Sequence, residues 1–186
     1  MENIKNEKKH LKTIEIVYIA LFATIMAVCS WISIPATVPF TLQTFGVFCA
    51  VGLLGGKRGT ISVAVYILLG FIGVPVFAGF SGGIGVLFGA TGGYIIGFIF
   101  SALIYWLTTK MFGQKTVVMA IAMFLGLLGC YAFGTAWFMM IYAKTTGAIG
   151  LATALGWCVV PFVIPDIIKI ALSLLLVKRV SPYVQI

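Results

Sequence analysis

The stretch TVVMAIAMFLGLLGCYAFGTAWFMMIY runs from Thr116 to Tyr142 without a charged side chain. A helix that crosses the hydrocarbon core of a bilayer needs about 20 predominantly apolar residues, within a range of roughly 17 to 25. In lipid the backbone polar groups must bond to one another, which a lone apolar segment achieves as a helix. This stretch therefore predicts a membrane-spanning helix, and it makes an all-α membrane protein the expected fold class.

The rest of the 186-residue chain has the same character. Hydrophobic residues make up 62% of it and charged residues 9%, and its mean hydropathy is +1.18. Ordinary soluble proteins contain about 25% charged residues. The whole chain holds only four acidic residues, Glu2, Glu7, Glu15 and Asp166. Such a composition argues against a soluble enzyme, a disordered protein and a nucleic-acid-binding protein.

Six apolar runs are long enough, or nearly so, to cross a membrane. They cover about residues 14–34, 41–54, 60–72, 92–111, 116–142 and 151–177. The second and third runs are short, which suggests tilted helices or helices capped by loops. We therefore expect a polytopic protein with an N-terminal tail (residues 1–12) and a domain of six transmembrane helices (residues 13–186).

The basic residues indicate how these spans are oriented. Ten of the twelve lie in the N-terminal tail, the turns at residues 55–59 and 110–115, and the C-terminus, whereas the opposite loops hold only Lys144. Cytoplasmic loops of membrane proteins carry an excess of Lys and Arg. We therefore expect both termini to be cytoplasmic and the protein to lie in the cell membrane. The same distribution explains the net charge of +8 without nucleic acid.

Asp166 and Lys169 are the most informative pair of residues. They lie within the last apolar run, and their i, i+3 spacing places both on one helix face. Lys169 is ten residues before Arg179, or about 15 Å of helix, which is about half of the hydrocarbon thickness. A charge at this depth costs on the order of 3 kcal/mol. We expect a polar ligand site in which Lys169 binds a carboxylate and Asp166 accepts hydrogen bonds.

Two other interpretations of this pair stay open. It is also consistent with a self-satisfied ion pair that only fixes helix packing, or with a proton relay. Pro165 directly precedes Asp166, and it is expected to allow a fresh helical segment to begin there.

The glycine-rich stretch between Phe77 and Tyr94 is too irregular in sequence for one simple helix. Irregular backbone at membrane depth is tolerated where it lines a cavity or is buried in protein, and glycine permits close backbone approach. The alternative is helix packing by small residues. Phe77, Phe80 and Tyr94 are candidates for an apolar cavity wall, and Gln43 is a candidate hydrogen-bond donor. Ordinary packing or an interfacial aromatic belt is the alternative for the three aromatic residues, and an ordinary glutamine at the membrane interface is the alternative for Gln43.

Other chemistry has little support in the sequence. There is no nucleophile–base constellation and no ATP-binding motif, so we expect no enzymatic activity. The four cysteines lack metal-ligand spacing, and we expect them to be reduced, with neither a metal nor a cofactor. Ala20, Ala23 and Ala27 share one face of the first helix, where small residues let another helix approach closely. This spacing is either incidental or a surface for an external partner.

Five segments together resemble the BioY family, the biotin-specific substrate-binding (S) component of energy-coupling factor (ECF) vitamin transporters. They are PFTLQ (39–43), LGGKRG (54–59), YILLGFIGVPVF (66–77), GATGGY (89–94) and DIIK (166–169). The resemblance implies six membrane helices with cytoplasmic termini. It also implies an outward-opening biotin pocket, covered by the loop between the first two helices and the loop between the third and fourth.

The resemblance further implies roles for particular residues. Asp166 would accept a hydrogen bond from a ureido N–H of biotin, and Lys169 would pair with the valerate carboxylate or a polar group near it. Ser81 and Gly82 in the glycine-rich loop are expected to be substrate-binding residues. Ser81 takes the place of a typical family asparagine, and its hydroxyl reaches less far. The Ala23-x-x-x-Ala27 face matches the surface that meets a transmembrane coupling subunit. That subunit and two ATPase subunits would supply the energy.

Three alternatives to a biotin S component follow from the same residues. The chain could bind another vitamin within the same transporter class. It could be a self-sufficient small transporter or channel that uses Asp166 and Lys169 as a coupling pair. It could also be a membrane assembly protein in which this ion pair is structural.

Overall fold

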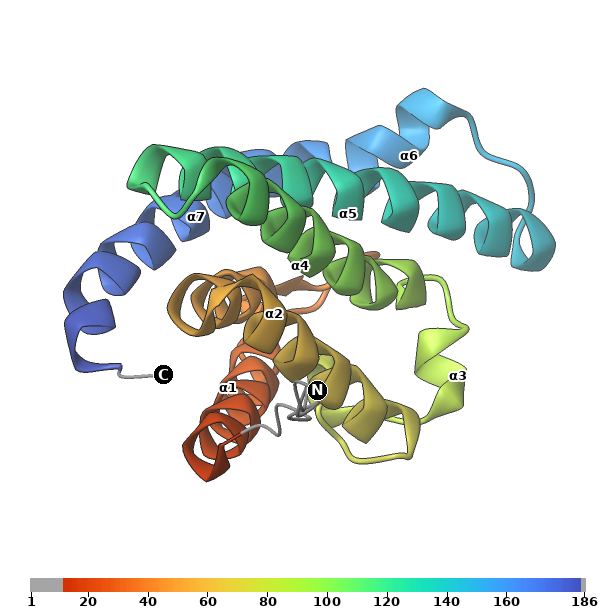
Figure 1. Ribbon diagram of the computed structural model, residues 1–186. Coiled ribbons are helices and arrows are strands. Elements are labelled where there is room, and N and C mark those ends of the chain that lie inside the picture. The colour runs from red at the N-terminus through yellow and green to blue at the C-terminus, as the bar shows by residue number, and fades with distance from the viewer. Residues whose placement is uncertain (1–11, 185–186) are drawn as a thin grey trace, which may run out of the picture.

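The computed structural model describes residues 12–184, so the predicted tail lies almost entirely outside the described residues. Figure 1 shows a bundle of helices. The long helices are α1 (Thr13–Trp31), α2 (Gln43–Phe71), α4 (Gly92–Phe112), α5 (Thr116–Thr145) and α7 (Val160–Val180). The short elements are α3 (Ile84–Leu87), α6 (Leu151–Cys158) and the 3₁₀ turns η1 (Ala78–Phe80) and η2 (Ser181–Tyr183). The prediction of a helical membrane protein is confirmed.

One small sheet interrupts the helices. The strand β1 (Ser33–Ile34) pairs antiparallel with β2 (Phe40–Thr41). This hairpin connects α1 to α2 around the two prolines at positions 35 and 39, which oppose helix continuation. It therefore fixes where the residues that follow β2 enter the bundle.

Within residues 12–184, five helices are long and apolar enough to cross a membrane. They are α1, α2, α4, α5 and the stretch Val160–Tyr183, which is α7 with its terminal 3₁₀ turn. The sequence predicted six spans, because it separated residues 41–54 from residues 60–72. In the structure these two runs form one element, α2.

The backbone of α2 folds back on itself at Gly55. This residue has φ +75° and ψ 166°, which is not helical and is a conformation that glycine adopts without a steric penalty. A Cβ atom on Gly59 would lie 2.5 Å from the Cα of Val51, although eight residues of straight helix are about 12 Å long. Gln43 likewise forms a hydrogen bond with Tyr66. The element is thus a hairpin of two helical segments, residues 43–54 and 56–71.

The last apolar run (residues 151–177) is divided into two helices, but not at Pro165 as expected. The break lies at Val159 (φ −125°, ψ −56°), between α6 and α7, and α7 continues through Pro165. The expectation of a fresh helix at Pro165 was wrong. Pro161 is in the first turn of α7, where a missing N–H leaves no intrahelical bond unmade, so the helix begins there instead.

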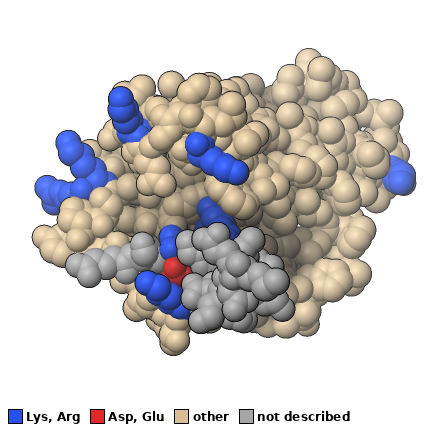
Figure 2. Space-filling model, in the orientation of Figure 1, with Lys and Arg blue, Asp and Glu red and all other residues tan. Residues whose placement is uncertain are grey.

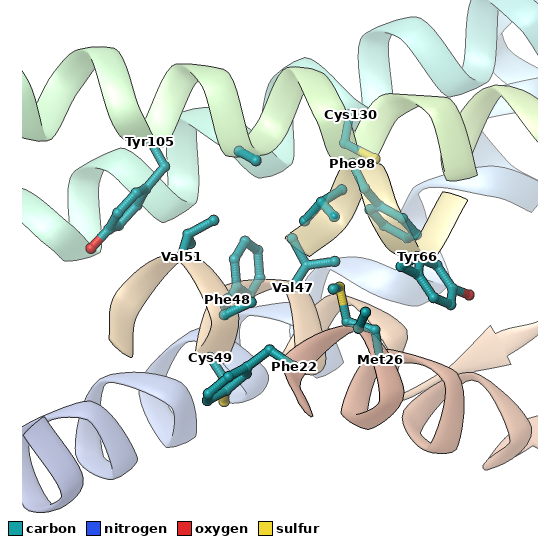
Figure 3. Close-up of a cluster of buried hydrophobic side chains, with 14 of the residues drawn as sticks. Phe22, Met26, Val47, Phe48, Cys49, Val51, Tyr66, Phe98, Tyr105 and Cys130 are labelled. Atoms are coloured by element: carbon teal, nitrogen blue, oxygen red, sulfur yellow. The ribbon is translucent and has the colours of Figure 1, made fainter. Parts of the chain in front are cut away.

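The α2 hairpin is the centre of the bundle. It contacts α1, α4 and α7, and α4 packs along α5. Figure 3 shows the apolar side chains that these helices bury between them. Labelled members of this core are Phe22, Met26, Val47, Phe48, Cys49, Val51, Tyr66, Phe98, Tyr105 and Cys130. All four cysteines are free and buried, as predicted.

The small-residue face of α1 is part of this internal packing. Ala23 and Ala27 are only 1% and 4% exposed and belong to the core. A Cβ atom on Gly46 of α2 would lie 3.2 Å from the Cα of Met26, so the two helices approach closely at this face. The expectation that Ala23 and Ala27 form a partner surface was therefore wrong, whereas Ala20 is exposed.

Basic residues gather at one end of the bundle. Figure 2 shows most of the visible Lys and Arg side chains on the left part of the molecule, where Figure 1 places the turn between α4 and α5. Arg58 forms an ion pair with Glu15, with 2.5 Å between Nη2 and Oε1. This contact places the start of α1 beside the turn of the α2 hairpin.

The close contact inside the α2 hairpin leads to the first prediction. In Gly59→Ala the new methyl group would meet the backbone of Val51, and overpacking of this kind costs about 1–3 kcal/mol. We expect a lower unfolding temperature of the detergent-purified protein. Gly85→Ala is the matched control, because no atom lies within 4 Å of its Cβ position. Equal unfolding temperatures for the two variants would contradict the hairpin.

Candidate functional site

A pocket of about 240 Å³ lies between the end of β2, the loop before α3, and helices α4, α5 and α7. Ligand pockets for drug-sized molecules usually measure about 300–1,000 Å³, so this one suits a small molecule. Its polar lining residues are Thr41, Gln43, Thr44, Ser81, Thr91, Tyr94, Tyr131, Asp166 and Lys169. Its apolar lining includes Val38, Phe77, Val86, Ile95, Phe98 and Phe162. The pocket thus combines an apolar wall with a concentrated polar end.

The Asp166–Lys169 ion pair forms that polar end. The Nζ atom of Lys169 lies 2.7 Å from Oδ1 of Asp166, and the two residues are 5% and 2% exposed. Their i, i+3 spacing on α7 brings both side chains to one face, as the sequence predicted. Both residues line the pocket, so the pair faces neither lipid nor a sealed interior.

The remaining hydrogen-bonding groups of this pair are also satisfied. Lys169 Nζ donates to the Thr41 carbonyl (2.7 Å) and to Thr44 Oγ1 (3.1 Å), and it lies 4.5 Å from the centre of the Phe40 ring. Asp166 accepts from Thr44 Oγ1 (2.9 Å) and from the Tyr131 hydroxyl (2.5 Å). An ammonium group has three protons, and each has an acceptor here. The network ties α7 to the start of α2 and to α5.

The network explains how two charges persist in this place. Removing an ion from water costs several kcal/mol, and ion pairing offsets this cost only where hydrogen bonds satisfy the remaining groups. The structural and the ligand-binding interpretation of this pair are therefore compatible. It is satisfied by the protein, and it also borders a cavity.

Four of the other expected site residues line the pocket: Gln43, Phe77, Ser81 and Tyr94. The Gln43 amide donates to Tyr66, whose hydroxyl donates to the Val76 carbonyl (3.0 Å). Ser81 donates to the Ala78 carbonyl (2.7 Å), and the Tyr94 hydroxyl lies 2.9 Å from Thr135 Oγ1. These contacts hold the polar side chains in place around the cavity.

The structure does not bring Phe80 and Gly82 to the pocket wall. Phe80 is 65% exposed and stacks on Trp31 with 5.0 Å between ring centres. Gly82 lies against the preceding turn, since a Cβ atom there would be 2.4 Å from the Val74 carbonyl oxygen. Both residues support the loop that carries Phe77 and Ser81, and the indole N–H of Trp31 adds a hydrogen bond to the Pro75 carbonyl (2.9 Å).

Phe77 reaches the pocket because Gly70 leaves room for it. A Cβ atom on Gly70 would coincide with the Phe77 ring, and the ring also packs edge-on against Tyr66. Phe77 is consequently 1% exposed, with its ring held between α2 and the cavity.

Two side chains that hold the ion pair, those of Thr44 and Tyr131, were not predicted from the sequence. Tyr131 carried a usable signal, because a phenol in the middle of a charge-free apolar run normally needs a hydrogen-bond partner. Thr44 follows Gln43 directly and has no such signal of its own. Its role depends on how the α2 hairpin meets α7.

Comparison with known proteins gives one consistent result. The model of the BioY family matches residues 5–186. The "Biotin transporter BioY" of Thermotoga maritima is 39% identical over 156 residues, which cover 83% of this chain and 79% of that protein. The "Probable biotin transporter BioY" of Pyrococcus horikoshii is 37% identical, and the match covers 92% of this chain and 98% of that protein.

A solved structure has the same fold. The S component for biotin from an ECF-type ABC transporter matches with a TM-score of 0.80 and 30% sequence identity, over 90% of each chain. These proteins are named as transporters of biotin or as a component of such a transporter.

The satisfied ion pair leads to a prediction about stability. Removing one partner of a buried pair costs about 3–5 kcal/mol, because the other charge remains buried and unpaired. We expect Asp166→Asn and Lys169→Met each to lower the unfolding free energy by about this amount. The double variant should lose much less than the sum. A double-mutant cycle in detergent measures this coupling, and additive losses would show that the two residues do not stabilise each other.

Proposed function

This chain belongs to the BioY family, and on this premise we propose that it is the membrane-embedded biotin-binding S component of an ECF-type transporter. The observation that carries the proposal is the buried Asp166–Lys169 pair at the polar end of a pocket of about 240 Å³. The relatives named as biotin transporters and the biotin S component of the same fold support biotin as the ligand.

The chemistry of biotin matches this lining. Biotin has one carboxylate, a neutral ureido ring and an otherwise apolar body. Lys169 is the one basic residue among the described residues that line the pocket, and it supplies a cation for the carboxylate. The carboxylate would replace the Thr41 carbonyl or the Thr44 hydroxyl as an acceptor, because both of these groups are neutral. Aromatic side chains such as Phe77 and Phe98 enclose the apolar body.

The ureido group needs partners of the opposite kind. Asp166 offers carboxylate oxygens, which accept from N–H groups. The Ser81 hydroxyl already donates to the Ala78 carbonyl, so its oxygen is left to accept a hydrogen bond. Ser81 is thereby suited to a ureido N–H, with a shorter reach than a longer side chain would have.

Transport requires further subunits in this proposal. The chain has no ATP-binding motif and its family is one of transporters, so we propose that a transmembrane coupling subunit and two ATPases supply the energy. The buried Ala23 and Ala27 do not offer a docking surface. Uptake that persists without ATPases would favour a self-sufficient transporter instead.

We also propose six membrane crossings with both termini in the cytoplasm. The two segments of the α2 hairpin count as separate crossings, although the first has only 12 residues (43–54). The ion pair between Glu15 and Arg58 supports placing the start of α1 and the α2 turn on one side of the membrane. The excess of Lys and Arg at the same end of the bundle supports assigning that side to the cytoplasm.

Biotin binding by purified protein tests the proposed ligand and the role of Lys169. We expect nanomolar binding of biotin and no comparable binding of other vitamins. Biotinamide, which lacks the negative charge, should bind about 10- to 100-fold more weakly, because hydrogen bonds to charged groups contribute about 1.5–3 kcal/mol. In Lys169→Met this preference for the carboxylate should disappear. Equal weak binding of all vitamins would reject biotin, and tight binding of a different one would assign another S component.

A second set of variants separates binding from folding. The double variant Asp166→Asn/Lys169→Met is expected to fold, since it buries no unpaired charge, yet to bind biotin at least 100-fold more weakly. Lys178→Met, an exposed position near the end of the same helix, is the matched control and should bind normally. Unchanged biotin affinity in the double variant would make the ion pair purely structural.

Labelling of intact cells tests the proposed topology. Lys144→Cys and Lys115→Cys both place a thiol at an exposed position, while the four native cysteines are buried and contribute little background. A membrane-impermeant maleimide should label Lys144→Cys from outside and Lys115→Cys only after lysis. The reverse result would invert the proposed orientation.

A further inference from the structure

A second pocket lies at the opposite end of the α2 hairpin from the ion pair. It has a volume of about 270 Å³ and lies where the turn of the hairpin meets the end of α4 and the start of the α4–α5 turn. Lys57, Arg58 and Lys110 line it, together with Gln114. Three basic side chains thus converge on one cavity, and none of the acidic residues within residues 12–184 lines it.

The glycine turn of α2 builds this pocket. At Gly55 (φ +75°) the chain reverses its direction. The next residue, Gly56, lies against α4. A Cβ atom on Gly56 would lie 2.5 Å from the Cα of Trp106, so only glycine allows this approach. The turn therefore brings Lys57 and Arg58 beside Lys110, which is in the last turn of α4.

The three basic side chains differ in whether an acidic residue neutralises their charge. Arg58 is held by Glu15, whereas Lys57 and Lys110 form no ion pair with an acidic residue of the described part of the chain. Both lysines are exposed. The pocket consequently keeps a positive charge that is available to an anion.

An apolar groove continues from this pocket along the outer face of α4. Leu103, Trp106, Leu107 and Lys110 line the groove, and Trp106 and Lys110 also line the basic pocket. Leu103 and Leu107 are 41% and 61% exposed. Together the two cavities form one site with a basic end and an apolar groove that extends along α4.

We propose that this composite site binds one anionic phospholipid. Its phosphate would lie between Lys57 and Lys110, with Arg58 behind them, and an acyl chain would follow the groove over Leu103 and Leu107. Lysine binds phosphate as a point charge, and tryptophan is enriched at the headgroup level of membranes. A free phosphate would use the basic pocket alone, and an acidic protein segment would leave the apolar groove empty, so a lipid fits the pair of cavities better than either.

Lipid binding to the full-length protein in detergent tests this proposal. Phosphatidylglycerol and phosphatidylcholine with identical acyl chains are titrated, and the bound fraction is measured by native mass spectrometry. We expect wild-type protein to bind phosphatidylglycerol at least tenfold more tightly. In the double variant Lys57→Gln/Lys110→Gln the affinity for phosphatidylglycerol should fall about 25-fold, since one basic residue near an anionic lipid contributes about fivefold.

The matched control is Lys115→Gln/Lys178→Gln, which removes two exposed basic residues that do not line the pocket. We expect its affinity for phosphatidylglycerol to stay within threefold of wild type. Retained biotin binding shows that each variant is folded. An equal loss in the control would mean diffuse attraction to anionic lipid and would overturn the proposal.

Two further measurements distinguish a bound phospholipid from a free anion and from a protein partner. Inorganic phosphate is expected to displace phosphatidylglycerol only at concentrations at least 100-fold higher than those at which the lipid binds, and displacement at comparable concentrations would assign a site for a free anion. A variant Lys57→Gln/Lys110→Gln that keeps its lipid preference but loses ATPase-dependent uptake would assign the site to a protein partner. The absence of any preference in wild-type protein would equally overturn the lipid site.

Discussion

The Asp166–Lys169 ion pair has to be kept out of the hydrocarbon, and the arrangement of the other helices depends on this requirement. Each of the two charges costs several kcal/mol to remove from water unless it is fully hydrogen-bonded. The helix α7 cannot satisfy both charges from its own backbone. Thr41 therefore approaches from β2, Thr44 from the start of α2 and Tyr131 from α5. The pocket lies where these three elements converge.

The α2 hairpin connects this polar centre to the opposite end of the bundle. Its first segment has 12 residues (43–54), or about 18 Å of helix, which is shorter than a bilayer core of about 30 Å. The β1–β2 hairpin directly precedes this segment, and the loop before α3 follows the second segment of the α2 hairpin. Gln43 and Thr44 line the pocket at one end of the α2 hairpin, whereas the Gly55 turn carries Lys57 and Arg58 at the other end.

Properties of neighbouring residues were sufficient to predict that the apolar runs form helices, that Asp166 and Lys169 share a helix face, and that the glycine-rich loop is irregular. Each of these depends on the hydropathy, spacing or conformational freedom of neighbouring residues. The break at Val159, the partners of Asp166 and the burial of Ala23 were not predictable in this way. They depend on how one helix is rotated against another. A membrane helix that is apolar on all sides carries no hydrophobic pattern that reveals its buried face, so Ala23 looked equally suited to an external partner.

A polar network that is complete without a ligand is compatible with binding, because only neutral acceptors need to be exchanged. In the proposed complex, Lys169 would exchange the Thr41 carbonyl for the ligand carboxylate and keep its ion pair with Asp166. A ligand with a single negative charge adds one favourable contact to Lys169. A second negative charge would find no further cation among the described residues that line the pocket. A cationic ligand would meet the ammonium group of Lys169. These properties are consistent with the proposed ligand, because biotin carries one carboxylate and no other charged group.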